Sequence, residues 1–249
     1  LIPYSSFVIL SEPDERAGLA EKILNEGWKA IKVRLHHKEF DKDLETIEKI
    51  VEKTGKKLDI LVDANQAQSS YPWQPGIIWD MDRAKRTNEA MHELGCYWLE
   101  EPRPRFNYKE LAELVSMKKT KIAGGENNTV VSDFNEMVEK NSYDILQPEL
   151  MVLGGISPLI EIGDLSRKYN KEIVPHHGGG DIGVIAHIHI LSTWENAPYC
   201  EILNDPPLSS YKHKFFIFNE NPEVIDGKIK VPEGPGLGVS IKEELIIRE

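Results

Sequence analysis

Short apolar runs alternate with amphipathic stretches along nearly the whole chain, and this alternation limits the fold more than any other feature. The runs predict eight strands, at residues 1–10, 30–35, 58–63, 97–100, 121–123, 144–147, 172–175 and 199–203. Strands that alternate with helices favour parallel pairing and an α/β fold. Eight such units predict a closed (β/α) barrel of the TIM type, which typically takes about 250 residues. An open doubly wound sheet is the alternative, but no GxGxxG motif follows the first strand.

Helices are expected between these strands, at residues 11–25, 41–53, 80–94, 108–117, 133–140, 157–169 and 183–194. Ser11 is a candidate N-cap for the first of them, because a serine side chain can accept a hydrogen bond from a free backbone N–H. Ser157 and Pro158 predict the start of the sixth, as a cap followed by an N1 proline. We expect residues 1–205 to form the barrel and 206–249, which are rich in proline and glycine, to form an extension.

The charge balance of the chain excludes some partners. Lys+Arg number 30 and Asp+Glu 41 in 249 residues, a net charge of −11. Nucleic-acid partners usually meet a basic surface, and anionic lipid attracts basic segments, so we expect neither nucleic acid nor membrane as a partner. No basic segment of the signal-peptide type opens the chain, and two cysteines are too few for a disulfide framework. A cytoplasmic location is therefore expected.

Polar and charged side chains recur where the predicted strands end. In a parallel barrel all strand ends of this kind face one mouth, so these residues would lie close together. They are Lys32, Arg34, Asp63, Asn65, Glu100, Glu126, Glu149, His176 and Glu201. Asp63, Glu100 and Glu126 end three consecutive strands, and converging carboxylates repel one another unless a cation joins them. Oxygen ligands of this kind suit Mg²⁺ better than zinc.

The motifs that carry these residues resemble those of a known family. The runs GWKAIKVR, VDANQ, WLEEP, GGEN, QPE with a following GGI, PHH and CEIL occur in order along the chain. Together they resemble the C-terminal barrel domain of the enolase superfamily, and most closely its mandelate racemase subgroup, which includes acid-sugar dehydratases. The resemblance covers nearly the whole chain.

The resemblance implies a role for each matching residue. The implied Mg²⁺ ligands are Asp63, Glu100 and Glu126, and the implied base is His176, oriented by Glu149. Other implied site residues are Lys32 and Arg34 on strand two, Glu201 on strand eight, which would bind the substrate carboxylate, and the candidate substrate-binding residues Asn65, His177 and Asn127. A family member of this kind removes a proton α to a carboxylate, and we expect dehydration of a sugar acid through an enolate.

Three departures from the family pattern leave alternatives open. Strand six has Glu149 where the family usually has aspartate, and strand two has Arg34 where many members have a second lysine. Arginine stays protonated at ordinary pH, which disfavours a two-base racemase, although Lys32 could be the opposite base. A racemase, epimerase or cycloisomerase on the same site therefore stays open. The sequence also starts at the first barrel strand, so the family's capping domain is expected to be cut off, on another chain or lost. A non-catalytic barrel is the third alternative.

Other features carry weaker expectations. The long aromatic segment 66–79, with Tyr71, Trp73 and Trp79, is expected to form a lid or to pack against another subunit, and with the resemblance it favours a homo-oligomer. His187 and His189 are two residues apart on a predicted helix, so they would not share a face and no shared metal site is expected.

Overall fold

Eight parallel strands form one continuous sheet in a computed structural model that describes residues 1–67, 77–178 and 182–246. The strands are β1 (Pro3–Ser6), β2 (Ala30–Arg34), β3 (Asp59–Asp63), β4 (Trp98–Glu100), β5 (Lys121–Gly124), β6 (Ile145–Leu146), β7 (Glu172–Ile173) and β8 (Cys200–Leu203). The hydrogen-bonded order is β7-β6-β5-β4-β3-β2-β1-β8, and every neighbouring pair is parallel. Each strand from β1 to β6 therefore pairs with the next in the chain, and β8 pairs with β1, as in a barrel.

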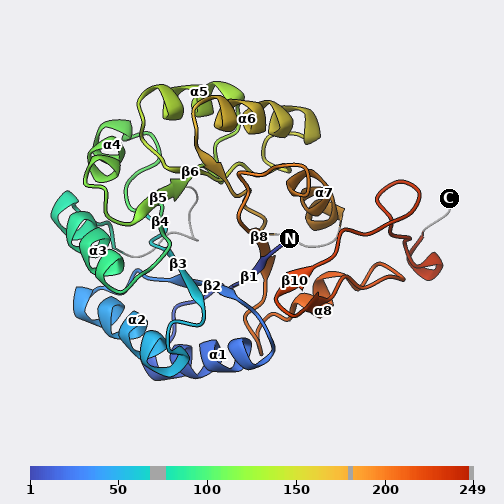
Figure 1. The fold of residues 1–249 in the computed structure, drawn as a ribbon, viewed down its shortest axis with the longest axis horizontal. Helices are drawn as coiled ribbons and strands as arrows, with labels where there is room; N and C mark the ends of the chain where they lie inside the picture. Colours follow the sequence, from blue (N-terminus) through green and yellow to red (C-terminus); the bar gives the residue numbers. More distant parts are fainter. Residues whose placement is uncertain (68–76, 179–181, 247–249) are drawn as a thin grey trace.

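Seven helices lie outside this sheet in the described part of the chain and surround it as a ring (Figure 1). They are α1 (Pro13–Asn25), α2 (Phe40–Thr54), α3 (Met81–Glu93), α4 (Tyr108–Ser116), α5 (Val131–Glu139), α6 (Ile156–Lys168) and α7 (Ile182–Leu191). A βα unit at every step confirms the predicted α/β barrel class. The ends of the sheet, β7 and β8, meet through the Glu201 side chain, whose Oε2 accepts a hydrogen bond from the His177 backbone N–H at 2.9 Å.

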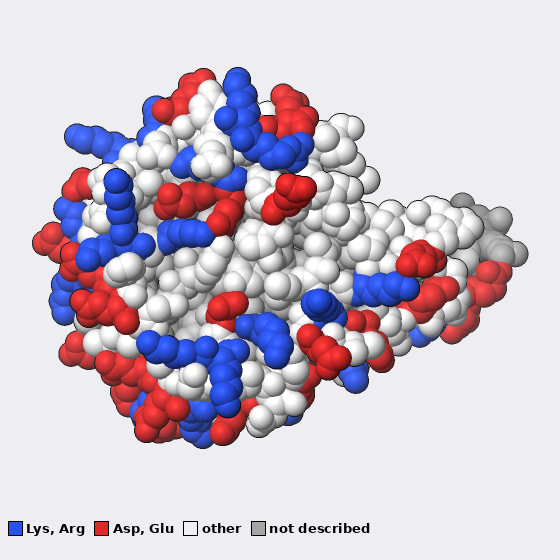
Figure 2. Space-filling model, viewed as in Figure 1, with Lys and Arg blue, Asp and Glu red and all other residues white. Residues whose placement is uncertain are grey.

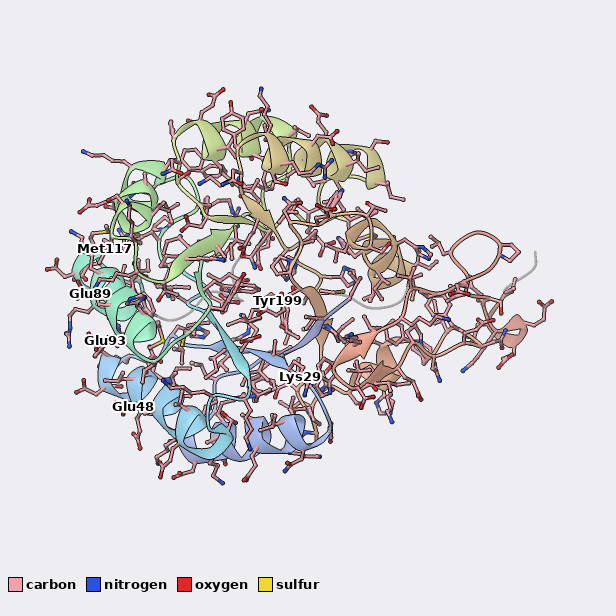
Figure 3. The ribbon with its side chains drawn as sticks, viewed as in Figure 1. Lys29, Glu48, Glu89, Glu93, Met117 and Tyr199 are labelled. Carbon is pink, nitrogen blue, oxygen red and sulfur yellow. The ribbon has the colours of Figure 1, made fainter. Side chains whose placement is uncertain are left out.

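The interior of the barrel is filled by one residue from each strand or its immediate flank. These buried residues are Tyr4, Ala30, Leu61, Trp98, Ala123, Ile145, Val174 and Tyr199. Trp98 and Tyr199 meet edge to face with ring centroids 6.0 Å apart, and Figure 3 shows Tyr199 near the centre of the ring of helices. The polar residues at the strand ends therefore lie over a closed hydrophobic layer and not over an open channel.

At the first and the sixth helix, the N-cap is not the residue that the sequence predicted. The first helix has Glu12 as its N-cap and Pro13 as its first residue, so Ser11 lies outside it. The sixth begins at Ile156 with Gly155 as its N-cap, which places Ser157 and Pro158 inside the first turn. Proline has no N–H and fits anywhere in a first turn, where those groups have no helical partner. Its presence therefore located the start of this helix only to within two residues.

The chain after the last barrel strand forms a smaller, extended region. It contains the short helix α8 (Tyr211–Lys214), the antiparallel pair β9 (Val224–Ile225) and β10 (Lys228–Ile229), and the 3-10 turn η1 (Glu243–Leu245), and it projects to one side in Figure 1. The Leu1 amino group and the Ile229 N–H each donate to the other residue's carbonyl, which ties this region to β1. The division at residue 205 stays a prediction.

Charged side chains of both signs are mixed over the face seen in Figure 2, with no large area of a single sign. Many are paired along helices, as Lys140 is with Glu136 on α5 and Lys49 with Glu45 on α2. Among the described residues, none of the helices has the length and apolar character that crossing a membrane requires. Residues 68–76 of the predicted lid, with Tyr71 and Trp73, lie outside the described residues, whereas Trp79 is buried and its backbone N–H donates to Gln66 Oε1.

Candidate active site

A buried lysine links the strand ends at the mouth of the barrel. Lys32 on β2 is 1% exposed, and its Nζ lies 2.8 Å from Glu100 Oε1, 3.0 Å from Glu201 Oε1 and 3.8 Å from Asp63 Oδ2. Burial would lower the pKa of Lys32, but the three carboxylates outweigh it and raise the pKa well above the usual value. The amine therefore stays a cation and ties the ends of β2, β3, β4 and β8 together.

Glu100 is held in place by two buried donors, Trp98 and Gln147. Its Oε2 accepts from Trp98 Nε1 at 3.0 Å and from Gln147 Nε2 at 2.9 Å. Burial raises the pKa of Glu100, and although Lys32 opposes this, the carboxylates around it help to bring the pKa to about 7. A further cation beside this carboxylate would stabilise its ionised form and lower its pKa.

Asp63 is held by its own strand end and by β2. Its Oδ1 accepts from the Asn65 backbone N–H at 2.9 Å, and its Oδ2 accepts from Asn65 Nδ2 at 3.1 Å. Asn65 has a φ of 50°, in the left-handed region that asparagine tolerates better than most residues. Arg34 Nη1 lies 3.5 Å from Asp63 Oδ2 and also bonds to Asn65 Oδ1, so the predicted substrate-binding Asn65 here braces Asp63.

His176 lies between two carboxylates. Its Nδ1 is 3.1 Å from Glu149 Oε2, and its Nε2 is 3.3 Å from Glu126 Oε2. Burial would lower the pKa of His176, but Glu126, Glu201 and the hydrogen bond to Glu149 raise it to about 10. Asn127, another predicted substrate-binding residue, donates from Nδ2 to Glu126 Oε1 at 2.7 Å and so braces this acid.

Glu201 on β8 is surrounded by donors. Ser6 Oγ donates to its Oε1 at 2.7 Å, and the His177 backbone N–H donates to its Oε2. Burial would raise the pKa of Glu201, but Lys32, His176 and these hydrogen bonds lower it far below the usual range. Ser6 ends β1, but the predicted strand ran to residue 10, so the predicted strand end did not identify Ser6.

His177 does not line the mouth beside His176. Its side chain is 3% exposed, its Nδ1 lies 3.4 Å from Glu149 Oε1, and its ring packs on that of His187 with centroids 5.0 Å apart. This burial places it behind the base and does not favour contact with a substrate. His187 and His189 are separated as predicted, because His189 Nε2 bonds to the Leu237 carbonyl in the extension.

The acids at this mouth have the chemistry of a site for a hard divalent cation. Asp63, Glu100 and Glu201 are buried beside the cations of Lys32 and Arg34, and Glu126 is among the acids that raise the pKa of both. The buried Glu101 adds a further carboxylate, whose Oε1 has no hydrogen-bond partner within the described part of the chain. These donors fit Mg²⁺, and Asp63, Glu100 and Glu126 could hold it. Within the part of the chain that the structure describes, the oxygens of these three acids do not all lie within 4.8 Å of one another, and Lys32 Nζ contacts Asp63 and Glu100.

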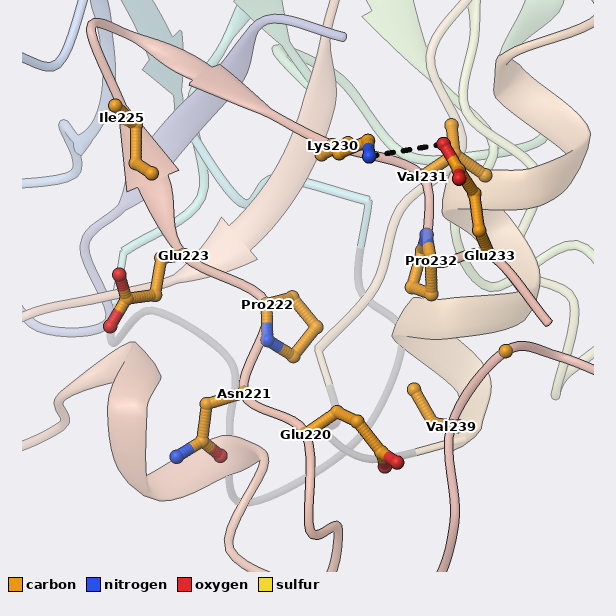
Figure 4. A pocket seen from close by; sticks show the side chains of 11 residues that line it. Glu220, Asn221, Pro222, Glu223, Ile225, Lys230, Val231, Pro232, Glu233 and Val239 are labelled. Carbon is orange, nitrogen blue, oxygen red and sulfur yellow. Dashed lines mark ion pairs between the residues drawn. The ribbon is translucent and has the colours of Figure 1, made fainter.

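A separate cavity of about 460 Å³ lies in the C-terminal region and takes none of its lining from the strand ends (Figure 4). Its walls include Pro222, Ile225, Val231 and Val239, and the Lys230–Glu233 ion pair lies at its side. It is therefore a feature of the extension and not part of the barrel mouth.

Comparison with known proteins relates this arrangement to a group of enzymes. A family model described as "Enolase C-terminal domain-like" matches residues 15–245. The chain is 30% identical over 218 residues to an arabinonate dehydratase of Saccharolobus solfataricus, a match that covers 87% of this chain and 54% of that protein. It is 26% identical to an L-talarate/galactarate dehydratase of Salmonella typhimurium, with 88% and 49% covered. The chain thus spans about half the length of the curated relatives it matches.

Solved structures agree on the fold. The L-talarate dehydratase from Polaromonas sp. JS666, solved with Mg and L-glucarate, superposes with a TM-score of 0.83 at 23% identity, covering 98% of this chain and 62% of that one. A putative mandelate racemase from Bordetella bronchiseptica, solved with 2-oxoglutarate and phosphate, gives 0.86 at 23% identity, with the same coverage.

Proposed function

Because the chain belongs to the enolase C-terminal domain-like family, we propose that it takes part in Mg²⁺-dependent removal of a proton α to a carboxylate, with dehydration of a sugar acid as the overall reaction. The observation that carries the proposal is the position of His176, held between Glu149 and Glu126 beside the acids that Lys32 joins. A base, a carboxylate that orients it and a group of acids that can hold a metal ion are the parts that this reaction needs.

His176 is the proposed base. Its Nδ1 faces Glu149, so Nε2, which lies 3.3 Å from Glu126 Oε2, is the nitrogen proposed to take the substrate α-proton once Glu126 binds a cation. Glu126 is the first carboxylate that raises the pKa of His176, and sharing Glu126 with a bound cation would weaken that effect. The pKa would then move down toward neutrality, where an imidazole can both accept a proton and return it.

Charge that develops on the substrate carboxylate must be compensated in a buried site. A Mg²⁺ held by Asp63, Glu100 and Glu126 would supply positive charge to both carboxylate oxygens. Lys32 adds a fixed ammonium at the same place, and Glu201, kept ionised by Lys32 and Ser6, is proposed to orient the substrate beside it. Little rearrangement is needed during the reaction because these groups are already held by the barrel.

Loss of water completes the proposed reaction. After His176 has taken the α-proton, the C–O bond to the β-hydroxyl breaks and the electron pair of the enolate forms the new carbon–carbon double bond. The His176 imidazolium can return its proton to the departing hydroxyl, which leaves as water. The resulting enol rearranges to a 2-keto-3-deoxy acid, and His176 is neutral again.

A two-base racemase or epimerase is less well supported. Lys32 would have to be neutral to act as the opposite base, yet its three carboxylate neighbours raise its pKa well above 10.5. Burial opposes protonation of Arg34, but the surrounding acids raise the pKa of this guanidinium further. Arg34 therefore cannot act as a base, and Glu201, which is not one of the proposed Mg²⁺ ligands, would still favour the protonated form of Lys32, so His176 is the proposed single base.

The relatives support a sugar acid as the substrate class. An arabinonate dehydratase and an L-talarate/galactarate dehydratase are among the proteins that the chain resembles in sequence. A homo-oligomer stays a proposal as well.

The test is a screen for dehydration with the purified chain. Arabinonate, talarate, galactarate and rhamnonate are incubated with Mg²⁺, and the 2-keto acid product is trapped with semicarbazide and measured by its absorbance. We expect one or more acids to react with Mg²⁺ and none after chelation. Proton exchange or inversion without loss of water would favour the isomerase alternative, and tight Mg²⁺ binding without any reaction would favour a non-catalytic barrel.

A further inference from the structure

The structure assigns a positioning role to His177: we propose that this residue holds Glu149 and Glu201 in place on either side of the base. The inference rests on the proposed role of His176. His177 is adjacent to the base in sequence but turned away from the mouth, and it touches both acids through different groups.

Two contacts carry the proposal. The His177 backbone N–H donates to Glu201 Oε2 at 2.9 Å, and His177 Nδ1 lies 3.4 Å from Glu149 Oε1. The other oxygen of Glu149 faces His176 Nδ1 at 3.1 Å. His177 therefore connects the carboxylate that orients the base with the carboxylate at the end of β8, across the place where β7 and β8 meet.

The packing around His177 leaves its ring little choice of position. The side chain is 3% exposed, and its ring is tilted 55° against that of His187 on α7. The His177 ring also packs closely against Gly183, where an added Cβ would lie only 2.5 Å from His177 Cε1. A side chain confined in this way can hold its partner at a fixed distance.

The two carboxylate oxygens of Glu149 have different partners, so the position of Glu149 determines the orientation of His176. Glu149 Oε1 accepts from the Met151 N–H at 3.1 Å in addition to facing His177, while Oε2 serves His176. Burial would raise the pKa of Glu149, but the hydrogen bonds from His176 and His177 lower it to about 2. A glutamate has one more rotatable bond than an aspartate, so it needs contacts on both oxygens to hold one imidazole in a single orientation.

The same three side chains have the spacing of a small metal site. One donor atom each from Glu149, His177 and His187 lies within 4.8 Å of the others. Backbone donors, however, already point at two of these atoms, since the Leu150 N–H lies 3.4 Å from His187 Nε2 and the Met151 N–H bonds to Glu149. A metal would have to displace these N–H groups, so the geometry favours a hydrogen-bonded support.

The test compares His177→Leu with His177→Asn in the full chain. Leucine removes the side-chain donor, whereas the asparagine amide can donate from near the position of Nδ1, and both keep the backbone N–H. His92→Leu on α3, whose side chain is exposed, is the matched control. Thermal unfolding verifies that all three variants fold.

Two readouts are used, and one needs no substrate. In ¹⁵N-histidine-labelled protein, the proton on His176 Nδ1 should give a slowly exchanging signal that is lost in His177→Leu and kept in His177→Asn and His92→Leu. With whichever of arabinonate, talarate, galactarate or rhamnonate the chain dehydrates, kcat should fall about 10–100-fold in His177→Leu while KM changes little, and asparagine should restore most of it.

The outcomes separate this inference from the proposed function. An unchanged His176 signal and kcat in His177→Leu would overturn the inference, as would equal losses in the leucine and asparagine variants. Stoichiometric Zn²⁺ binding that disappears in both His177→Leu and His187→Leu would overturn it in favour of a metal site. If none of the four acids reacts but the signal behaves as expected, the support of Glu149 by His177 stands and the proposed function fails.

Discussion

At the scale of single residues, Lys32 determines the charge of the site. It is the one ammonium within ion-pair distance of Asp63, Glu100 and Glu201 in the described part of the chain. Spacing along the sequence predicted that these residues end neighbouring strands at one level. Which of them pair could not be predicted, because pairing depends on side-chain direction and on partners such as Trp98 that lie one layer below.

Replacing Lys32 by methionine should destabilise the fold strongly at neutral pH. The change keeps the volume but leaves buried carboxylates without their cation, which costs about 3–5 kcal/mol for a broken buried pair. Urea unfolding at pH 7 measures this loss. Lys85→Met is the control, because Lys85 pairs with Glu113 at the surface and its loss should not be measurable. Equal effects of the two substitutions would contradict the central position given to Lys32.

Stability should also fall as the pH rises from about 4.5 to 7 when metal is absent. The folded pKa of Glu100 is raised to about 7, so the folded state binds a proton that the unfolded chain has already released. A raised pKa adds stability below 4.5 that is lost toward 7, on the order of 3 kcal/mol for this group. Glu101, whose pKa is also raised by burial, adds to the same trend.

Unfolding free energies at pH 5 and pH 7 in a chelator test this prediction. Glu100→Gln should reduce the difference between the two, because glutamine does not titrate. Glu149 does not interfere, since its lowered pKa of about 2 affects stability only below 4.5. His176, with a pKa raised to about 10, loses its contribution between 6.5 and 10. A difference that is as large in Glu100→Gln as in the unsubstituted chain would refute the assignment.

At the scale of elements, the order and type of the barrel strands and helices were predictable because each βα unit repeats the same hydrophobic pattern. Element ends were less predictable. The Ser157-Pro158 pair has the chemistry of a helix start, but Gly155 takes the cap position and the helix begins at Ile156. His187 was missed as a neighbour of Glu149, because its partners lie in the segments that follow β6 and β7 and no spacing within α7 reveals them.

Substitution by alanine is expected to change the stability of the fold in opposite directions at two helix glycines, Gly163 and Gly18. A Cβ on Gly163 in α6 would lie 2.3 Å from Trp194 Cζ2, so Gly163→Ala should cost about 1–3 kcal/mol through overpacking. Gly18 in α1 has no such neighbour within 4 Å, so Gly18→Ala should stabilise by about 0.5–1 kcal/mol. Thermal or urea unfolding compares them. Stabilisation by both would show that Trp194 can move aside.

At the scale of the whole molecule, hydrophobic side chains fill the interior of the barrel, and the candidate site lies at the mouth above them. Tyr4, Trp98 and Tyr199 fill the interior, and the ring of Tyr4 lies 5.7 Å below Lys32 Nζ. The buried Arg16–Asp205 pair, at 2.8 Å, joins α1 to the chain just after β8 and so fixes the last strand against the first. The site side chains therefore lie on strands that are held by a packed interior. Proton transfer at a defined carbon requires fixed positions of this kind.

The most direct test of this account is proton exchange in heavy water, followed by NMR with Mg²⁺ and the four sugar acids. We expect the unsubstituted chain to lose the α-proton signal of at least one acid, and His176→Asn to abolish this loss while the protein still binds Mg²⁺. Continued exchange in His176→Asn would contradict the assignment of the base and, with it, the proposed mechanism.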